Sequence, residues 1–215
     1  MTETTAKTPK GRERQQGVLA CAIDTFIELG YERASLGKII EKAGGSRSTV
    51  YQCYGNKAGL FKAALQMLAD DIYGAYMADY RPGRTLKDEF FAFGTILLKQ
   101  LLSERAVGAM RLIISESPQM PEIGKWFFNE GIAKSHYGFA KVLENHIAAP
   151  MSELEPIASH YVEMLKGRLL MQALCLPGCT VDETQILREV EYTTEWMLIF
   201  LHAKFEPGQF IASND

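Results

Sequence analysis

The sequence has no long apolar run, which limits the kinds of protein it can be. The longest strongly apolar stretch, Trp196 to Ala203, contains His202 and falls well short of the roughly 18 residues that a membrane span needs. The first ten residues contain no apolar segment of the kind that marks a secretory signal. We therefore expect no membrane association and a cytoplasmic location.

Cysteine and histidine are scarce and scattered. Four cysteines among 215 residues do not form the dense pattern of a disulfide-stabilised secreted protein. The four histidines are isolated from one another and form no His-Glu-x-x-His motif, so we expect no metal and no cofactor. Cys175 and Cys179 flank a Leu-Pro-Gly turn and leave open a thiol-based redox sensor as an alternative function.

Motifs of common enzyme classes are also missing. No glycine-rich phosphate loop follows a strand pattern, and the formal Ser-x-x-Lys match from Ser35 to Lys38 has none of its companion motifs. Ser35 already has a role as a helix cap. A small-molecule-processing enzyme is therefore the less favoured alternative, and we expect no catalytic residue.

The sequence does contain helical periodicity almost throughout. Sustained period-two alternation and Asn-Gly or Asp-Gly hairpin turns are absent, whereas apolar residues recur at spacings of three and four. Proline and glycine mark the expected helix ends. The predicted fold is all-α, with about nine helices near residues 12–29, 35–43, 46–54, 57–80, 85–103, 105–116, 122–148, 156–176 and 182–204.

Charge is distributed unevenly along the chain, although the net charge is only −3. Residues 1–60 hold nine lysines and arginines against six acidic residues, a net +3, whereas the remainder holds 14 against 20, a net −6. Such asymmetry indicates a basic part that faces nucleic acid. The basic residues Lys7, Lys10, Arg12 and Arg14 are either an arm for the minor groove or a solubilising tail.

Residues 26–61 carry the strongest functional pattern. Two short helices separated by Gly44-Gly45 have the layout of a helix-turn-helix. The second helix keeps a polar face at its N-terminal end, which is the end that a recognition helix places in the major groove. Arginine, serine and threonine bind base edges or phosphates, and tyrosine and lysine suit phosphates at the groove margin. The candidate DNA-binding residues are Ser35, Lys38, Ser46, Arg47, Ser48, Thr49, Tyr51, Tyr54 and Lys57.

This segment resembles the DNA-binding domain of the TetR family of bacterial transcriptional regulators. The resemblance rests on Phe26, Gly30-Tyr31, Ser35, Ile39, Ala43-Gly44, Ser46, Thr49, Tyr51, Tyr54, Lys57 and Leu60. It implies a homodimer with an N-terminal three-helix DNA-binding domain and a C-terminal helical domain for ligand binding and dimerisation. We place these domains at 11–56 and 57–205, between a flexible N-terminal tail at 1–10 and a C-terminal tail at 206–215.

The C-terminal part carries a second, shorter resemblance. Residues 111–116 and 121–127 are similar to the AefR-like and efflux-regulator subgroup of the same family, which points to control of efflux or stress-tolerance genes. Methionine and aromatic side chains of the middle helices are available to line a cavity, and such a cavity suits an apolar or aromatic effector. The candidate effector-binding residues are Met67, Phe91, Phe93, Met110, Trp126, Phe127, His136, Tyr137, Met164 and Met171.

The last two predicted helices are apolar nearly all round. Such a helix must be buried on both sides, one side against its own domain and the other against a partner subunit. A wholly internal helix is the alternative. The candidate dimer-interface residues are Tyr161, Leu165, Arg168, Leu169, Gln172, Val190, Thr194, Met197 and Leu201.

Together these features predict a ligand-responsive repressor that binds a (pseudo)palindromic operator in double-stranded DNA as a homodimer. Two recognition helices fit successive major grooves only when they lie about 34–36 Å apart, or at another multiple of the helical turn. An unidentified small-molecule effector would release the DNA by changing that spacing. The long helix from Lys57 is the expected lever, since tilting it moves the DNA-binding head.

Overall fold

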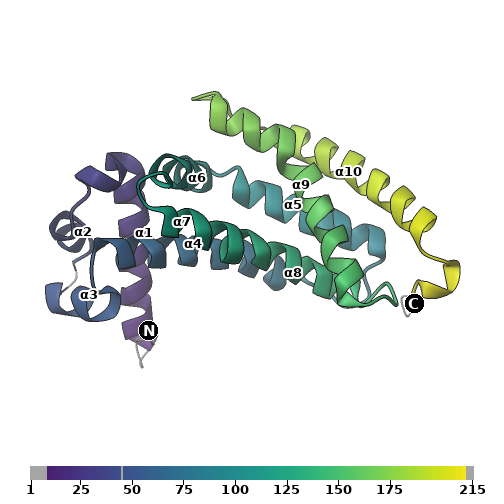
Figure 1. The fold of residues 1–215 in the computed structure, drawn as a ribbon, viewed down its shortest axis with the longest axis horizontal. Coiled ribbons are helices and arrows are strands. Elements are labelled where there is room, and N and C mark those ends of the chain that lie inside the picture. Colours follow the sequence, from purple (N-terminus) through teal and green to yellow (C-terminus); the bar gives the residue numbers. More distant parts are fainter. Residues whose placement is uncertain (1–8, 45, 212–215) are drawn as a thin grey trace. The chain divides into compact units, whose positions relative to one another are not determined.

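The computed structural model describes residues 9–44 and 46–211, and these are helical almost throughout (Figure 1). The predicted all-α fold is confirmed: in this part of the chain the only β pairing is an isolated bridge between Ile147 and Phe210. None of its helices is long and apolar enough to cross a membrane. The helices are α1 (Pro9–Arg33), α2 (Leu36–Ala43), α3 (Arg47–Tyr54), α4 (Lys57–Asp79), α5 (Leu86–Leu101), α6 (Glu104–Glu116), α7 (Pro121–Trp126), the π-helix η1 (Phe127–Ile132), α8 (Ala133–Leu143), α9 (Met151–Cys175), α10 (Glu183–Lys204) and the short 3₁₀ helix η2 (Pro207–Gln209).

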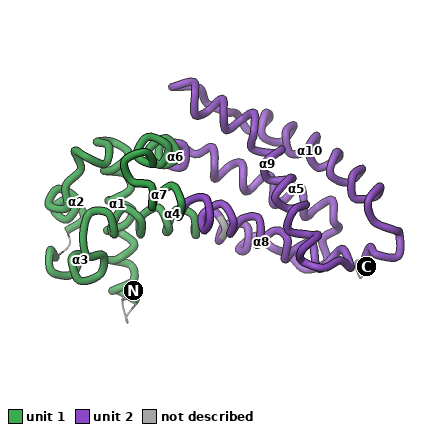
Figure 2. Tube along the Cα trace, in the orientation of Figure 1, with its two compact units in different colours: residues 1–71, 108–126 green, residues 72–107, 127–215 purple. Residues whose placement is uncertain are grey.

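The chain forms two compact units (Figure 2). The first comprises the residues up to 71 together with 108–126, and the second comprises 72–107 together with the residues from 127 onwards. The predicted domain boundary after residue 56 therefore differs from this division, which falls within α4. Of the predicted N-terminal tail, residues 1–8 lie outside the described part, while Pro9 and Lys10 already belong to α1.

The first unit is built around α1. Phe26 of α1 packs on Phe61 of α4 with ring centroids 4.9 Å apart, and Tyr31 packs on the same ring at 5.2 Å. Ile39 of α2 is fully buried in the same unit. The predicted helix end at residue 29 is replaced by a kink at Gly30, whose φ of 76° is open to glycine at little cost, and α1 continues beyond it.

Helices α6 and α7 complete the first unit. Gly108 of α6 lies against Ile27 of α1, where an added Cβ would stand 2.7 Å from the Ile27 Cγ2 atom. The Lys62 ammonium of α4 lies 5.8 Å from the ring centroid of the buried Trp126 of α7. These contacts explain why a segment expected in the ligand domain packs with the N-terminal helices.

The predicted helix at 122–148 is divided into three segments. After α7 the backbone widens into the π-helix η1, and it returns to α-helix only at Ala133. Gly131 of η1 faces the Phe127 ring, and an added Cβ there would meet the Phe127 Cδ2 atom at 3.1 Å. The helical pattern indicated the segment, but π-helical turns are rare and have no sequence signal that the apolar spacing reveals.

The sequence predicted a helix that starts at Pro156, but α9 already begins at Met151. The Leu154 amide donates to the Pro150 carbonyl at 3.2 Å, so the helical hydrogen bonds are under way before the proline. Pro156 lies in the second turn of this 25-residue helix and has no amide to donate to the Ser152 carbonyl.

The second unit is a bundle of α5, α8, α9 and α10 with an aromatic core. Phe93 of α5 stacks on Phe139 of α8 with centroids 4.1 Å apart, and Phe90 meets Tyr161 of α9 edge to face at 4.7 Å. The buried Tyr161 hydroxyl donates to the Phe90 carbonyl at 2.6 Å. Helices α9 and α10 run side by side in opposite directions (Figure 1).

The predicted C-terminal tail is ordered over its first six residues. The Ala148 amide donates to the Gln209 carbonyl at 2.7 Å, and the Ile211 amide donates to the His146 carbonyl at 2.9 Å. The Phe210 ring stacks on His202 of α10 with centroids 5.0 Å apart. Residues 206–211 are therefore held against the end of the bundle, and 212–215 lie outside the described part.

A buried polar cluster joins the end of α4 to the start of α5. The Tyr76 hydroxyl donates to the Glu89 Oε2 atom at 2.8 Å, and both side chains are at most 2% exposed. Arg84 pairs with Asp79, Nη2 to Oδ2, at 2.7 Å, while its Nη1 atom lies 3.9 Å from Glu89 Oε2. Burial raises the pKa of Glu89, and the Tyr76 hydrogen bond and the Arg84 charge only partly oppose that shift.

Replacing Glu89 by glutamine is expected to stabilise the protein at high pH and to have little effect at low pH. Because the folded-state pKa lies above that of the unfolded chain, Glu89 contributes stability that is present below the unfolded value and lost as the pH rises through the folded value. Glutamine keeps an acceptor for Tyr76 and removes the buried charge. Thermal melts between about pH 4 and pH 8 measure this, because carboxyl groups of unfolded chains titrate near the lower limit. A constant difference between variant and wild type, or a variant less stable at the upper limit, would contradict it; the exposed Glu155→Gln is the control.

Candidate nucleic-acid interface

Helices α2 and α3 and the turn between them form the predicted helix-turn-helix. Ser35 caps α2 as expected, because its side-chain oxygen accepts the Lys38 amide hydrogen. The helix ends at Gly44, which has a left-handed φ of 66° and donates its amide back to the Glu41 and Ile40 carbonyls. Apart from Gly45, which lies outside the described residues, the turn has the predicted layout.

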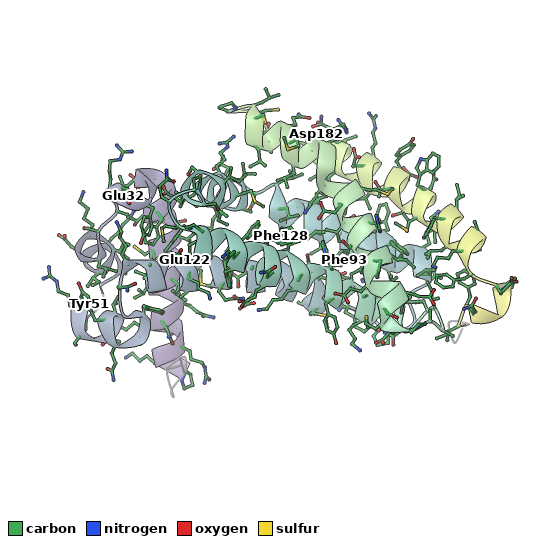
Figure 3. All side chains as sticks on the ribbon, viewed as in Figure 1. Glu32, Tyr51, Phe93, Glu122, Phe128 and Asp182 are labelled. Atoms are coloured by element: carbon green, nitrogen blue, oxygen red, sulfur yellow. The ribbon has the colours of Figure 1, made fainter. Side chains whose placement is uncertain are left out.

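Helix α3 presents a polar face to solvent. Val50 is its one buried residue at 3% exposure, whereas the three residues before it and Tyr51 after it are exposed. Tyr51 is 52% exposed and lies on the outer side of α3 (Figure 3). The exposed predicted residues in and beside this helix are Ser46, Arg47, Ser48, Thr49 and Tyr51.

The first turn of α3 has no side-chain cap. Ser46 has the backbone conformation of a cap, but its side chain makes no capping hydrogen bond. Its hydroxyl instead lies 2.8 Å from the Ser48 hydroxyl. The amides at this helix end therefore stay available to an external acceptor such as a phosphate.

Lys57 and Tyr54 lie less exposed than the other predicted contacts around α3. The Lys57 ammonium donates to the Tyr31 and Glu32 carbonyls at 3.0 and 3.2 Å and lies 4.3 Å from the Tyr31 ring centroid. Two of its three donors are thus engaged at the end of α1. The Tyr54 hydroxyl oxygen is buried. The Lys57 ammonium is thus engaged within the first unit in the absence of DNA, and the phosphate contacts of Lys57 and Tyr54 stay predictions.

The remaining predicted DNA contacts, Ser35 and Lys38, lie at the start of α2. Lys42, at the other end of the same helix, pairs with Glu28 of α1 at 3.6 Å. Sequence reasoning missed the contact of the Arg14 guanidinium with the Gly44 carbonyl at 2.9 Å, because it joins residues 30 positions apart.

The candidate effector residues are divided between the two units. Met67, Met110 and Trp126 belong to the first, and the other seven belong to the second. Phe93 is corrected to a core residue: at 2% exposure it is closed between Tyr76 and Phe139. The outward-facing members of the set are Phe91, Tyr137, Met164 and Met171, at 37–57% exposure.

His136 of α8 is the polar member of that set. Its Nε2 atom lies 3.4 Å from Glu163 Oε1 of α9, and the same carboxylate oxygen receives the Lys166 ammonium at 2.7 Å. Burial, followed by the nearby Lys166 charge, lowers the pKa of His136, so the neutral imidazole is favoured. A neutral ring can donate or accept one hydrogen bond from a polar group on a ligand.

The predicted dimer-interface residues are for the most part corrected. Seven of them are at most 3% exposed and face the core of their own unit, so they present nothing to a partner in this conformation. These seven are Tyr161, Leu165, Leu169, Val190, Thr194, Met197 and Leu201. Arg168 and Gln172 lie at the surface.

The outward side of α9 and α10 is instead formed by other apolar residues. Met164 and Met171 of α9 and Tyr192, Trp196 and Ile199 of α10 are 48–64% exposed. We call this set, with Phe200, the α9–α10 face. The sequence pattern showed that both helices are apolar all round, but it did not show which side packs inward.

The two cysteines of the redox alternative lie at and after the end of α9. Both are free thiols, Cys175 exposed and Cys179 half-buried. The Gln172 side-chain amide donates to the Cys179 sulfur at 3.1 Å. This contact gives Cys179 a structural partner on α9 and adds nothing in favour of a redox function.

Comparison with known proteins gives two family matches. Residues 18–64 match the model of bacterial regulatory proteins of the tetR family, and residues 88–200 match the C-terminal domain of AefR-like transcriptional repressors. The first match covers α2 and α3 with their supporting helices, and the second lies largely in the second unit.

Curated relatives match over parts of their length. An uncharacterized HTH-type transcriptional regulator, YezE of Bacillus subtilis, is 28% identical over 113 residues, which are 51% of this chain and 58% of the relative. The DNA-binding transcriptional repressor TetR of Mycobacteroides abscessus is 39% identical over 56 residues, 26% of this chain and 30% of the relative. The chain thus spans less than two thirds of these relatives.

Solved structures match over nearly the whole fold. A putative TetR-family regulator from Mesorhizobium loti has a TM-score of 0.72 at 23% identity and covers 90% of this chain and 98% of its own. A transcriptional regulator from Rhodococcus sp. RHA1 has a TM-score of 0.65 at 20% identity and covers 87% and 96%. With a helix-turn-helix in its first unit and a matched repressor-type domain over more than half of its length, the chain belongs to the TetR family of bacterial transcriptional regulators.

Proposed function

We propose that this protein is a homodimeric repressor that binds an inverted-repeat operator through α3 and is released by a small apolar or aromatic effector. The observation that carries the proposal is the exposed polar face of α3, a short helix whose one buried residue is Val50. Arg47 and Thr49 lie at its N-terminal end, where a recognition helix meets base edges. The backbone amides at the same end of α3 have no side-chain cap and can donate to a phosphate.

The homodimer is proposed to form through the α9–α10 face. Monomeric proteins rarely expose several large apolar side chains together, and rows of this kind mark interaction sites. Tyr192 and Trp196 meet edge to face at 6.2 Å, so the row is preformed. The Arg168 Nη2 atom of α9 lies 2.7 Å from the Glu189 Oε2 atom of α10, and this ion pair joins the two helices that carry the row. Two copies of one face related by a two-fold axis give a closed, isologous interface.

An effector role is proposed for the second unit because it carries most of the match to an AefR-like repressor domain. Of the predicted residues in this unit, Phe91, Phe127 and His136 have aromatic surface outside the core and are less exposed than Tyr137, which is 48% exposed. Aromatic rings with one neutral imidazole suit an apolar or aromatic effector that carries a single polar group. The proposal assigns these three residues to its recognition.

Release follows from linkage between the two ligands. An effector that binds better to a conformation with a different spacing of the two α3 helices weakens DNA binding, and DNA weakens effector binding by the same factor. Repression is favoured over activation because the matched C-terminal domain and a curated relative both carry that description.

Selection from a library of random duplexes tests the proposed DNA binding and identifies the operator in the same experiment. The purified protein should enrich an inverted repeat whose half-sites lie about one helical turn apart, or a multiple of it. The enriched duplex is then labelled with a fluorophore and bound to the protein. Compounds that lower the fluorescence anisotropy of this complex are candidate effectors. Failure to enrich any sequence, with no binding to DNA even at low salt, would overturn the proposal.

Replacing Arg47 by alanine is expected to weaken binding to the selected duplex by roughly tenfold, since a base-contacting arginine is worth about 1–3 kcal/mol. The fold should be unaffected because the side chain is exposed. Fluorescence anisotropy with the selected duplex measures the loss. Lys42→Ala, at the far end of α2, is the control, and equal affinities for Arg47→Ala and wild type would remove α3 from the interface.

A further inference from the structure

We infer that Arg14 is a positioning residue for DNA recognition: it does not bind DNA but holds the turn from which α3 begins. The inference rests on the proposed operator binding. Its starting point is one contact across 30 residues of sequence, in which the Arg14 Nη2 atom donates to the Gly44 carbonyl at 2.9 Å. Arg14 lies in the basic N-terminal segment that the sequence assigns to either a DNA arm or a tail.

Helix α3 has few contacts of its own to fix its position. It has eight residues and one buried side chain, and an isolated helix of that length is not stable in water. Its Ser46 cap makes no side-chain bond to the helix. Besides the buried Val50 and the half-buried Tyr54, the orientation of α3 therefore depends on the turn that precedes it.

That turn is made of the residues that restrict the backbone least. Gly44 and Gly45 follow one another, and Gly44 has a φ of 66°, in a region that glycine enters freely. A hydrogen bond to the Gly44 carbonyl restrains the turn from outside, three residues before Arg47. The restraint comes from α1, which is anchored in the core of the same unit by Phe26 and Phe61.

Electrostatics favour an arginine at this point. The end of α2 carries partial negative charge on its last carbonyl groups, and Gly44 is the residue that caps this end. Lys42 in the last turn is directed to Glu28, at 3.6 Å. The Arg14 guanidinium thus meets the carbonyl end of α2, and a charge-assisted bond of this kind is stronger than a neutral one.

A positioning role and a phosphate contact predict different salt dependences. A side chain that neutralises a phosphate contributes about 0.9 to the slope of log affinity against log salt, and it contributes equally on any sequence. A side chain that only orients α3 leaves that slope unchanged. Its loss lowers affinity for the selected operator and spares affinity for unrelated DNA, because non-specific binding does not require aligned base contacts.

The test measures wild type, Arg14→Gln, Arg14→Lys and Arg12→Gln by anisotropy on the selected duplex and on an unrelated duplex of equal length, over a series of salt concentrations. Arg12 is the matched control, because it is an exposed arginine on the same helix that lies two positions away and so faces elsewhere. For Arg14→Gln we expect an operator affinity about three- to tenfold lower, with a slope parallel to wild type and an unchanged affinity for unrelated DNA. Arg14→Lys, which retains a charged donor, should recover part of the loss.

Two outcomes would overturn the inference. One is a shallower salt slope with equal losses on both duplexes, which would make Arg14 a phosphate ligand. The other is an operator affinity for Arg14→Gln within twofold of wild type. Amide hydrogen exchange over residues 46–54 in the free protein should be faster in Arg14→Gln than in wild type. If Arg14→Gln does not fold, Arg14→Met takes its place in the same measurements. Equal affinities of the wild-type protein for the selected and the unrelated duplex would instead overturn the proposed function itself.

Discussion

Replacing Trp196 by aspartate is expected to produce a folded monomer whose affinity for the operator is lower by about 100-fold or more. Trp196 is 52% exposed in the isolated chain, so its removal leaves the core of the second unit intact. In a two-fold dimer each substitution occurs twice, and two carboxylates would be brought into an apolar contact, at a cost of several kcal/mol. The operator then loses its second half-site contact.

Size-exclusion chromatography with light scattering measures this effect, together with anisotropy on the selected duplex. Tyr137→Asp is the matched control, since Tyr137 is 48% exposed on α8 of the same unit and lies outside the α9–α10 face. It should remain dimeric. A Trp196→Asp variant that stays dimeric and binds the operator as wild type does would place the interface elsewhere.

Replacing Gly94 by alanine should lower the free energy of unfolding by about 2–3 kcal/mol, or roughly 5–10 °C in Tm. Gly94 lies where α5 crosses α9 and α10. An added Cβ would collide with the Tyr161 hydroxyl and would stand 3.1 Å from Val190 Cγ1. Tyr161 cannot move aside, because it is fully buried and its hydroxyl is bonded to the Phe90 carbonyl. This overpacking outweighs the gain of about 1 kcal/mol that alanine brings to a helix.

Two further variants separate the collision from helix propensity. Gly74→Ala, at an exposed helical position with open space around it, should stabilise the protein by about 0.5–1 kcal/mol. Tyr161→Phe removes the hydroxyl that the new Cβ would meet, so Gly94→Ala with Tyr161→Phe should cost less than the sum of the two single changes. Strict additivity, or a Gly94→Ala variant as stable as wild type, would contradict the packing argument.

The features that are determined locally were predicted best from the sequence. The Ser35 cap, the turn at Gly44 and the end of α3 near Tyr54 follow from one or two side chains each, and the structure confirms them. The all-α class was equally accessible, because the spacing of apolar residues is repeated over every helix. Ser46 shows the limit of this reasoning, since a good capping residue bonded Ser48 instead.

Contacts between distant residues were not predictable from one sequence. Lys57 has the charge of a phosphate ligand, yet its ammonium is directed to the carbonyls that end α1. Whether a basic side chain finds a carbonyl or faces solvent is decided by the approach of two helices, and the pattern along either helix does not indicate it. The contact of Arg14 with Gly44 and the pairing of Gln209 with Ala148 belong to the same class.

The largest error of the sequence-based prediction concerned which side of α9 and α10 packs inward. Both helices are apolar on all sides, so periodicity could not distinguish Leu165 and Met197, which are buried, from Met164 and Trp196, which are exposed. The two helices were nevertheless predicted, α10 within one residue at its start and α9 with a start five residues late. The proposal of a dimer through these helices therefore keeps its place in the chain and changes its residues.

The most direct test of the proposed function is the number of chains bound to the selected duplex and to the same duplex with one half-site scrambled, measured by sedimentation together with affinity. We predict two chains on the intact duplex, and an affinity lower by about 100-fold or more when one half-site is lost. A single chain bound with equal affinity to both duplexes would contradict a dimer that reads an inverted repeat with two α3 helices.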